Sequence, residues 1–168
     1  MFSSLYDVRK LDHEDIPMIF EFCKSNTQYY AYCGKENSYE LIESDLQITP
    51  PGIPLNQKYY VGFFAEEQLV AIMDLIDGYP DAEYIYIGFF MVNSVLQGTG
   101  IGTNIIQKVL AYLCALGFQK CQLAIDKDNP QSNHFWRKNG FEVIREVEHE
   151  GGELLVAEKK LHEQDGGS

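Results

Sequence analysis

The sequence predicts one domain of the α+β class, in which helices and strands alternate along 168 residues. Between 59 and 92 the chain carries successive apolar runs separated by turn-forming stretches, which is typical of neighbouring strands. From 103 to 116 apolar residues recur at helical spacing. With 45% hydrophobic residues, a chain of this length buries a single core. We therefore expect one domain over 1–162 and a disordered polar tail at 163–168.

The N-terminal part of the domain is predicted to hold one strand and two helices. The strand covers 5–9, and Asp12 is a suitable N-cap for a helix over 14–23. A polar, tyrosine-rich stretch follows at 25–37. The second helix covers 39–47 and ends before Pro50-Pro51-Gly52, which cannot continue a helix.

The rest of the domain is predicted to be mainly strand, with two further helices. Glu66-Glu67-Gln68 reads as a hairpin turn, and the cluster 77–81 as a second turn. The predicted strands are 59–65, 69–74, 84–92, 121–126, 142–147 and 153–161, the last two joined across Gly151-Gly152. One helix covers 103–116, with Gly117 as its left-handed cap, and another runs from Pro130 to Gly140.

The segment Gln97-Gly98-Thr99-Gly100-Ile101-Gly102 stands between a strand and a helix. Its glycines allow a tight turn that aims successive N–H groups at an anion, and the helix dipole adds positive potential there. The spacing is neither the dinucleotide fingerprint nor a Walker loop. It predicts a phosphate cradle, and the alternative is a glycine-rich turn that binds nothing.

A second segment, Asn129 to Phe141, makes a family resemblance specific. The loop resembles the Gln/Arg-x-x-Gly-x-Gly/Ala signature of the GNAT N-acetyltransferases, and Asn129 to Phe141 is similar to the family's Asn-x-x-Ala-x-x-Leu-Tyr-x-Lys-x-Gly-Phe helix. The resemblance implies the GNAT fold, an α/β/α sandwich with about four helices. Its sheet is mixed and mostly antiparallel, with the fourth and fifth strands parallel and splayed apart. It also implies acetyl-coenzyme A as the cosubstrate, with no metal.

The resemblance also implies where acetyl-coenzyme A binds. The pantetheine arm is expected to lie between the splayed strands as an extra strand, satisfying their free backbone groups. The Val92 N–H is the predicted donor to the oxyanion. Asn129 is expected to contact pantetheine, to cap a helix, or both. The residues predicted to bind the cosubstrate are Phe90, Met91, Val92, Gln97, Gly98, Thr99, Gly100, Ile101, Gly102, Thr103, Asn129, Ser132, Phe135, Trp136 and Lys138.

The sequence departs from the family pattern at Trp136, where many relatives carry a tyrosine that protonates the departing thiolate. An indole N–H is not a useful acid. Either another group or a water supplies that proton, or the thiolate leaves unprotonated, which its ordinary pKa near ~8.5 allows at neutral pH. Trp136 is expected to be a packing residue at the thioester end of the channel.

The general base is not fixed by the sequence. A branch of the family that acetylates ribosomal protein N-termini uses a glutamate on the fifth strand, where this chain has Ala124. Glu83 lies one place from the glutamate of the histone-acetylating branch. Asp74 is a second candidate, with turn capping as its alternative role, and His134 is expected to be exposed.

The acceptor is expected to be a primary amine. Tyr29, Tyr30 and Tyr32, with Tyr39, lie in the region that forms the family's acceptor site, where aromatic faces attract ammonium groups. Their alternative role is to cover an apolar surface. The preferred function is direct transfer of an acetyl group to a small-molecule amine in a ternary complex. The alternatives are a protein or peptide N-acetyltransferase and a non-catalytic coenzyme A sensor.

Composition narrows the partners. The 25 acidic and 13 basic residues give a net charge of −12, which argues against nucleic-acid binding and slightly favours a cationic acceptor. No apolar run is long enough to span a bilayer, and the N-terminus does not resemble a signal peptide, so we expect a cytoplasmic protein without membrane contacts. The four cysteines suit reduced thiols better than disulfides or zinc ligands. A homodimer is possible, as many relatives pair through sheet edges.

Overall fold

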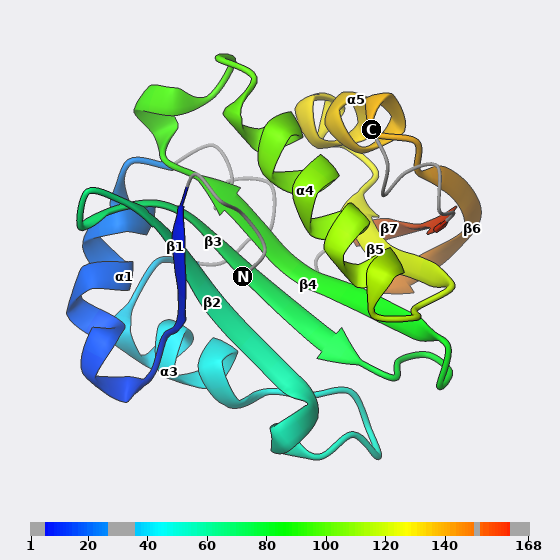
Figure 1. The fold of residues 1–168 in the computed structure, drawn as a ribbon, viewed down its shortest axis with the longest axis horizontal. Coiled ribbons are helices and arrows are strands. Elements are labelled where there is room, and N and C mark those ends of the chain that lie inside the picture. Colours follow the sequence, from blue (N-terminus) through cyan, green and yellow to red (C-terminus); the bar gives the residue numbers. More distant parts are fainter. Residues whose placement is uncertain (1–5, 27–35, 150–151, 162–168) are drawn as a thin grey trace.

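A computed structural model describes residues 6–26, 36–149 and 152–161. A seven-stranded sheet in the order β1-β2-β3-β4-β5-β7-β6 forms the middle layer (Figure 1). The strands are β1 (Asp7–Lys10), β2 (Lys58–Ala65), β3 (Gln68–Asp77), β4 (Tyr84–Val92), β5 (Lys120–Asp126), β6 (Glu142–His149) and β7 (Gly152–Lys160). The α-helices of these described ranges are α1 (Ile16–Lys24), α3 (Tyr39–Gln47), α4 (Ile101–Ala115) and α5 (Pro130–Lys138).

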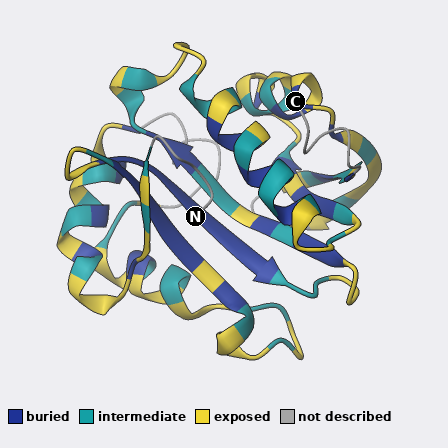
Figure 2. Cartoon of the chain, viewed as in Figure 1, coloured by how far each residue is buried: buried dark blue, intermediate teal, exposed yellow. Residues whose placement is uncertain are grey.

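The helices cover opposite faces of the sheet. Ile105, Ile106 and Val109 of α4 pack on one face with Met73 and Ile87. The other face is covered by α1 and α3 through a second cluster that includes Ile19, Ile42, Tyr60, Ile72 and Met91. Because side chains alternate along a strand, neighbouring residues of β3 contribute to different clusters. β3 is buried along almost its whole length, while the outer sides of the helices are exposed (Figure 2). The architecture is the expected α/β/α sandwich.

The one parallel pair among the described strands is β4 with β5, and it is short. Pairing runs from Tyr84 opposite Lys120 to Ile87 opposite Leu123, and both strands continue beyond it without pairing to each other. On its other edge β4 stays paired with β3 up to Val92. A gap therefore opens between β4 and β5 from Gly88 onward. We call the place where the gap begins, formed by the last pair, Ile87 with Leu123, and by Gly88, the vertex of this gap.

Most element boundaries agree with the sequence prediction, and two differ for clear reasons. The helix predicted from residue 14 begins as a 3-10 turn at His13–Asp15, and the α-helix starts at Ile16, just before Pro17, which suits a first helical turn. The strand predicted to end at Asp74 continues to Asp77, because Asp74 pairs with Tyr60 on one side and Phe89 on the other. The predicted tail 163–168 lies outside the described residues.

Candidate functional site

The glycine loop ends in an open helix N-terminus. Gly98 and Gly100 have φ values of +80° and +88°, the left-handed region that favours glycine, and a side chain at either position would meet no atom within 4 Å. The Asn104 N–H donates to the Gly100 carbonyl at 3.0 Å. The N–H groups of the first three helical residues precede this bond and have no acceptor within α4. They and the positive end of the helix dipole suit an anion.

Gly102 serves packing rather than the turn. A Cβ at this position would lie 3.1 Å from Phe135 and 3.4 Å from Val92. The missing side chain thus lets the first turn of α4 approach both β4 and α5. The glycines of the loop therefore have two different functions. Gly98 and Gly100 adopt the left-handed backbone of the turn, and Gly102 lets α4 approach β4 and α5 closely.

The backbone of β4 presents hydrogen-bonding groups to the gap. The Asn93 N–H points toward β3, because it donates to the Val70 carbonyl at 2.9 Å. In an antiparallel pair the backbone groups of successive residues point alternately to the two sides. Those of Val92 and Phe90 therefore point away from β3, into the gap. An extended ligand that carries amides can pair with them as an added strand.

A cavity of about 260 Å³ joins the loop to the gap. Of the fifteen residues predicted to bind the cosubstrate, all except Thr99 and Ile101 line it. The hydroxyl of Thr99 instead donates to the Leu96 carbonyl. Two residues that the sequence analysis missed, Asn26 and Gln131, complete the lining. The structure thus brings the two sequence motifs to one cavity, from segments about 30 residues apart.

Asn26 lies just after α1 and is held at the cavity by a hydrogen bond from Gln97. The Gln97 Nε2 donates to the Val92 carbonyl at 3.0 Å, which identifies this atom as the amide nitrogen. The same nitrogen donates to Asn26 Oδ1 at 2.7 Å, so the remaining amide atom of Asn26 is Nδ2. Asn26 is 7% exposed, and its buried Nδ2 has no hydrogen-bond partner among the described residues. No sequence signal distinguished this asparagine from the polar stretch around it.

On the α5 side, the cavity is lined by aromatic side chains and by Asn129, the N-cap of this helix. Asn129 accepts from the Ser132 N–H at 3.1 Å, so the predicted N-cap is confirmed. Trp136 is 9% exposed and packs edge-on against Phe90, Phe135 and Phe141, with ring centroids 4.9–6.0 Å away. The packing role expected for Trp136 is confirmed, and the indole lies at the same cavity.

A buried ion pair lies at the vertex. Lys58 Nζ donates to Asp74 Oδ2 at 2.7 Å, and the side chains are 2% and 10% exposed. Both face the side of the sheet that α1 and α3 cover, since Tyr60 and Ile72, two positions away, belong to that cluster. A Cβ on Gly88 would lie 2.8 Å from Asp74 Oδ2, so only glycine leaves room for this carboxylate. The turn-capping alternative for Asp74 is wrong, because its side chain bonds across the sheet.

The electrostatics of Asp74 combine two opposing effects. Burial raises the pKa of this carboxyl above its ordinary value, and the hydrogen bond and charge of Lys58 lower it by less. Oδ1 is buried and has no hydrogen-bond partner in the described part of the chain. Asp74 is therefore a more basic carboxylate than one in water, with one oxygen held by Lys58 and one uncommitted.

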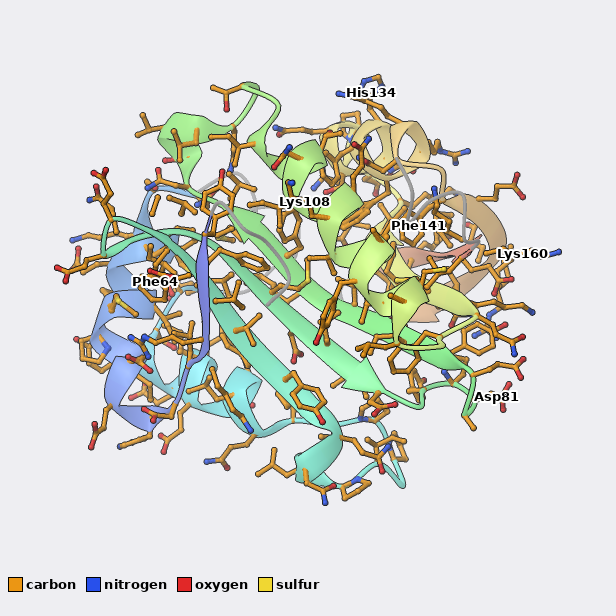
Figure 3. The ribbon with its side chains drawn as sticks, viewed as in Figure 1. Phe64, Asp81, Lys108, His134, Phe141 and Lys160 are labelled. Atoms are coloured by element: carbon orange, nitrogen blue, oxygen red, sulfur yellow. The ribbon has the colours of Figure 1, made fainter. Side chains whose placement is uncertain are left out.

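Other predicted residues lie elsewhere. Glu83 is exposed in the turn before β4, nine residues before Val92, which corresponds to about 30 Å along an extended strand. The structure does not bring it to the cavity. His134 is exposed at the rim of the molecule, as expected (Figure 3). Tyr39 is 50% exposed and packs edge-on against Phe20, which fits the covering role. Tyr29, Tyr30 and Tyr32 lie outside the described residues.

The sequence predicts neither a membrane span nor a metal site. Among those residues, no helix combines the length and hydrophobicity needed to cross a bilayer. No group of three or more acidic, histidine or cysteine side chains in those ranges could hold a metal ion. The described cysteines form no disulfide, and burial raises the pKa of Cys121, which favours its thiol form.

Comparison with known proteins gives a family match and several structural matches. The acetyltransferase (GNAT) family model matches residues 18–141. No curated protein gives a significant sequence match. The structure is similar to a spermidine N-acetyltransferase chimera from Vibrio cholerae and hSSAT, with 18% identity over 94% of this chain and 96% of the other and a TM-score of 0.71.

Two further structures are similar over nearly the whole chain. The PaiA N-acetyltransferase of Thermoplasma acidophilum, in complex with coenzyme A, has 20% identity, a TM-score of 0.65 and coverage of 92% and 98%. An acetyl transferase from Salmonella typhimurium that modifies the N-terminal serine of a ribosomal protein has 13% identity, a TM-score of 0.75 and coverage of 96% and 98%. At these identities the likeness shows a shared fold.

Proposed function

Because the chain belongs to the GNAT acetyltransferase family, we propose that it transfers the acetyl group of acetyl-coenzyme A to the primary amine of a small molecule. One observation carries the proposal. The gap between β4 and β5 has an anion-binding loop at its open end and a basic carboxylate, Asp74, at its vertex. A donor that fills the gap from the loop presents its far end close to that carboxylate.

Different parts of the cavity are proposed to bind different parts of the donor. The free N–H groups at the start of α4, where Gly102 and Thr103 line the cavity, hold the pyrophosphate, because a helix N-terminus stabilises negative charge. The backbone of Phe90 and Val92 pairs with the pantetheine amides. The Val92 N–H, expected from the sequence as donor to the thioester carbonyl oxygen, lies four residues from Gly88, which is about 13 Å along a strand. We propose the Phe90 N–H as that donor, because it faces the same gap only two residues from Gly88 and so brings the thioester closer to Asp74.

Transfer is proposed to occur by direct attack in a ternary complex. The acceptor amine must lose a proton before its nitrogen can attack the thioester carbon, and we propose Asp74 as the group that takes it. The N–C bond forms and the C–S bond breaks, and the sulfur leaves as a thiolate that the second amine proton neutralises. Trp136 supplies no proton in this scheme, because its indole is not an acid at neutral pH.

Asp74 is preferred to Glu83 on geometry. A general base must lie within hydrogen-bond reach of the proton it removes, directly or through one water. Asp74 lies beside Gly88, where the gap begins, whereas Glu83 is exposed and precedes β4, on the side where β4 and β5 are still paired. A small cationic acceptor is preferred because the chain carries a net charge of −12 and the vertex offers a carboxylate.

The test is release of free thiol from acetyl-coenzyme A in the presence of pooled amines, pooled peptides or no acceptor. We expect release with the amine pool, which can then be divided until one acceptor remains. Release with peptides alone would move the assignment to protein modification. Silence in every pool, together with measured donor binding, would favour a coenzyme A sensor.

A further inference from the structure

The ion pair at the vertex has a feature that donor binding leaves unexplained. Lys58 engages only Oδ2 of Asp74, and Oδ1 is buried with no partner in the described structure. Buried polar atoms in native proteins are almost always hydrogen-bonded, because an unpaired one costs free energy. Asp74 as a residue is only 7% exposed. An orphaned carboxylate oxygen in such a place indicates a partner that binds there.

We propose that Lys58 and Asp74 form the ammonium-binding site of the acceptor. Lys58 is the positioning residue, because it holds Oδ2 and thereby leaves Oδ1 for an N–H of a protonated amine. This inference rests on the proposed function, which it deepens by naming the residues that bind the ammonium group of the acceptor.

The parallel pairing of β4 with β5 ends beside this ion pair. Beyond the last paired position, Ile87 with Leu123, the next residues of the two strands are Gly88 and Ala124. Both are exposed and small, and both face the α1 and α3 side, as Asp74 does. The α4 and α5 side of the gap holds Val92, Phe135 and Trp136 of the donor cavity. The acceptor therefore enters from the face opposite α4 and α5.

The pair is suited to an ammonium rather than to an anion or a neutral alcohol. Lys58 and Asp74 together are neutral, so a lone anion gains little there. The one uncommitted atom is an acceptor, which calls for a donor, and a charged donor gives the stronger hydrogen bond. The ring of Tyr60 adds an aromatic face close to the pair, with Lys58 Nζ 5.8 Å from its centroid.

The proton balance follows from this placement. The ammonium gives one proton to Asp74, directly or through one water, and the neutral amine attacks the thioester carbon. After the C–S bond breaks, the product nitrogen carries one surplus proton, which neutralises the thiolate. Asp74 then returns its proton to solvent. No oxidant or metal enters the step.

Amine binding can be measured without turnover. Protein loaded with coenzyme A, which carries no acetyl group, is titrated calorimetrically with 1,4-diaminobutane and with 1,4-butanediol, its neutral analogue. We expect the diamine to bind wild type and the diol not to. Asp74→Asn should weaken diamine binding about tenfold or more, as expected for loss of a hydrogen bond to a charged group. Absent diamine binding to wild type, or equal binding to Asp74→Asn, would overturn the site.

Folding effects are separated by two further variants. The double variant Lys58→Met with Asp74→Leu replaces the pair by apolar groups, a change that is often neutral for stability. It should fold and bind coenzyme A but not the diamine. Gly88→Ala places a methyl group 2.8 Å from Oδ2 and should weaken diamine binding by moving the carboxylate. Diamine binding by the double variant at wild-type affinity would contradict the proposal.

The positioning role of Lys58 can be tested by the pH dependence of diamine affinity. Once an acceptor is known, the pH dependence of kcat/KM tests the same role. On this face, the titratable side chains of the neighbouring strands include Lys58 and Tyr60 of β2 and Tyr84 and Tyr86 of β4, and Lys58 is the described charge that acts on Asp74. Lys58 lowers the pKa of Asp74, so Lys58→Met should move the acidic limb of either pH profile to higher pH. Lys58→Arg should restore the limb to its wild-type position. An unmoved limb would refute the role of Lys58, whereas absent thiol release with intact diamine binding would refute only the transfer reaction.

Discussion

The two ends of the gap between β4 and β5 are built from different parts of the chain. The open end is made of backbone, with left-handed glycines and the N–H groups of a helix start contributed by one continuous segment. The vertex is made of side chains, a lysine and an aspartate that lie 16 residues apart on neighbouring strands. The first kind of site follows from local sequence, whereas the second depends on how strands pair.

A charge introduced at Gly100 should abolish most donor binding at the open end. Gly100→Asp places a carboxylate beside the bound phosphates, and two unit charges about 4 Å apart repel by about 4 kcal/mol at an effective dielectric constant of 20. We therefore expect acetyl-coenzyme A affinity to fall about a thousandfold, measured by calorimetry.

The matched control is Gly100→Asn. Asparagine has nearly the same shape as aspartate and tolerates the left-handed φ of +88° better than most residues, but it carries no charge. It should lose much less affinity than the aspartate variant. Equal losses would mean that the loop is sensitive to bulk rather than to charge, and no loss in either variant would remove the phosphate assignment.

Substitutions at the vertex are expected to change the stability of the protein rather than its affinity for the donor. Lys58→Met leaves the carboxylate of Asp74 buried and unpaired, which typically costs about 3–5 kcal/mol. Urea unfolding at pH 7 should show this loss, and the double variant with Asp74→Leu should recover most of it. A full loss that persists in the double variant would mean that the lysine stem, not its charge, stabilises the fold.

The stability loss in Lys58→Met should depend on pH. Because the folded-state pKa of Asp74 is raised, the folded protein binds the proton more tightly than the unfolded chain does. The contribution of this group to stability is therefore greatest below its ordinary pKa of 3.8 and is lost as pH rises through the raised value. The deficit of Lys58→Met relative to wild type should shrink on acidification, as unfolding curves at several pH values can test. A deficit independent of pH would exclude the carboxylate as its cause.

Within the open end, the two kinds of glycine should differ. Gly102→Ala crowds Phe135 and Val92, and overpacking of this kind typically costs about 1–3 kcal/mol. Gly98→Ala meets no neighbouring atom and carries only the cost of its φ of +80°. Thermal unfolding should therefore rank Gly102→Ala as the more damaging change. The reverse order would contradict the packing role assigned to Gly102.

The same contrast explains what sequence could and could not predict. The loop and the helix after Asn129 were predicted because their residues lie in fixed local spacing, and the cavity collects them. Lys58 was missed because a lysine at a strand start reads as exposed, and Asp74 read as a strand end because a carboxylate is rarely buried. Only the pairing of β2 with β3 shows that each one neutralises the other. Asn26 was missed because its role depends on Gln97, far along the chain.

The smallest predicted effect concerns Asn129, where capping and donor contact overlap. Asn129→Ala removes the acceptor of the Ser132 N–H and should cost about 1 kcal/mol of stability. Asn129→Asp keeps that acceptor, so its stability should stay close to wild type, but it brings a negative charge to the cavity wall. If Asn129 also contacts the donor, the aspartate variant will bind coenzyme A more weakly at unchanged stability. Unchanged affinity in both variants would leave Asn129 as a helix cap and place the contact with pantetheine on the backbone of β4.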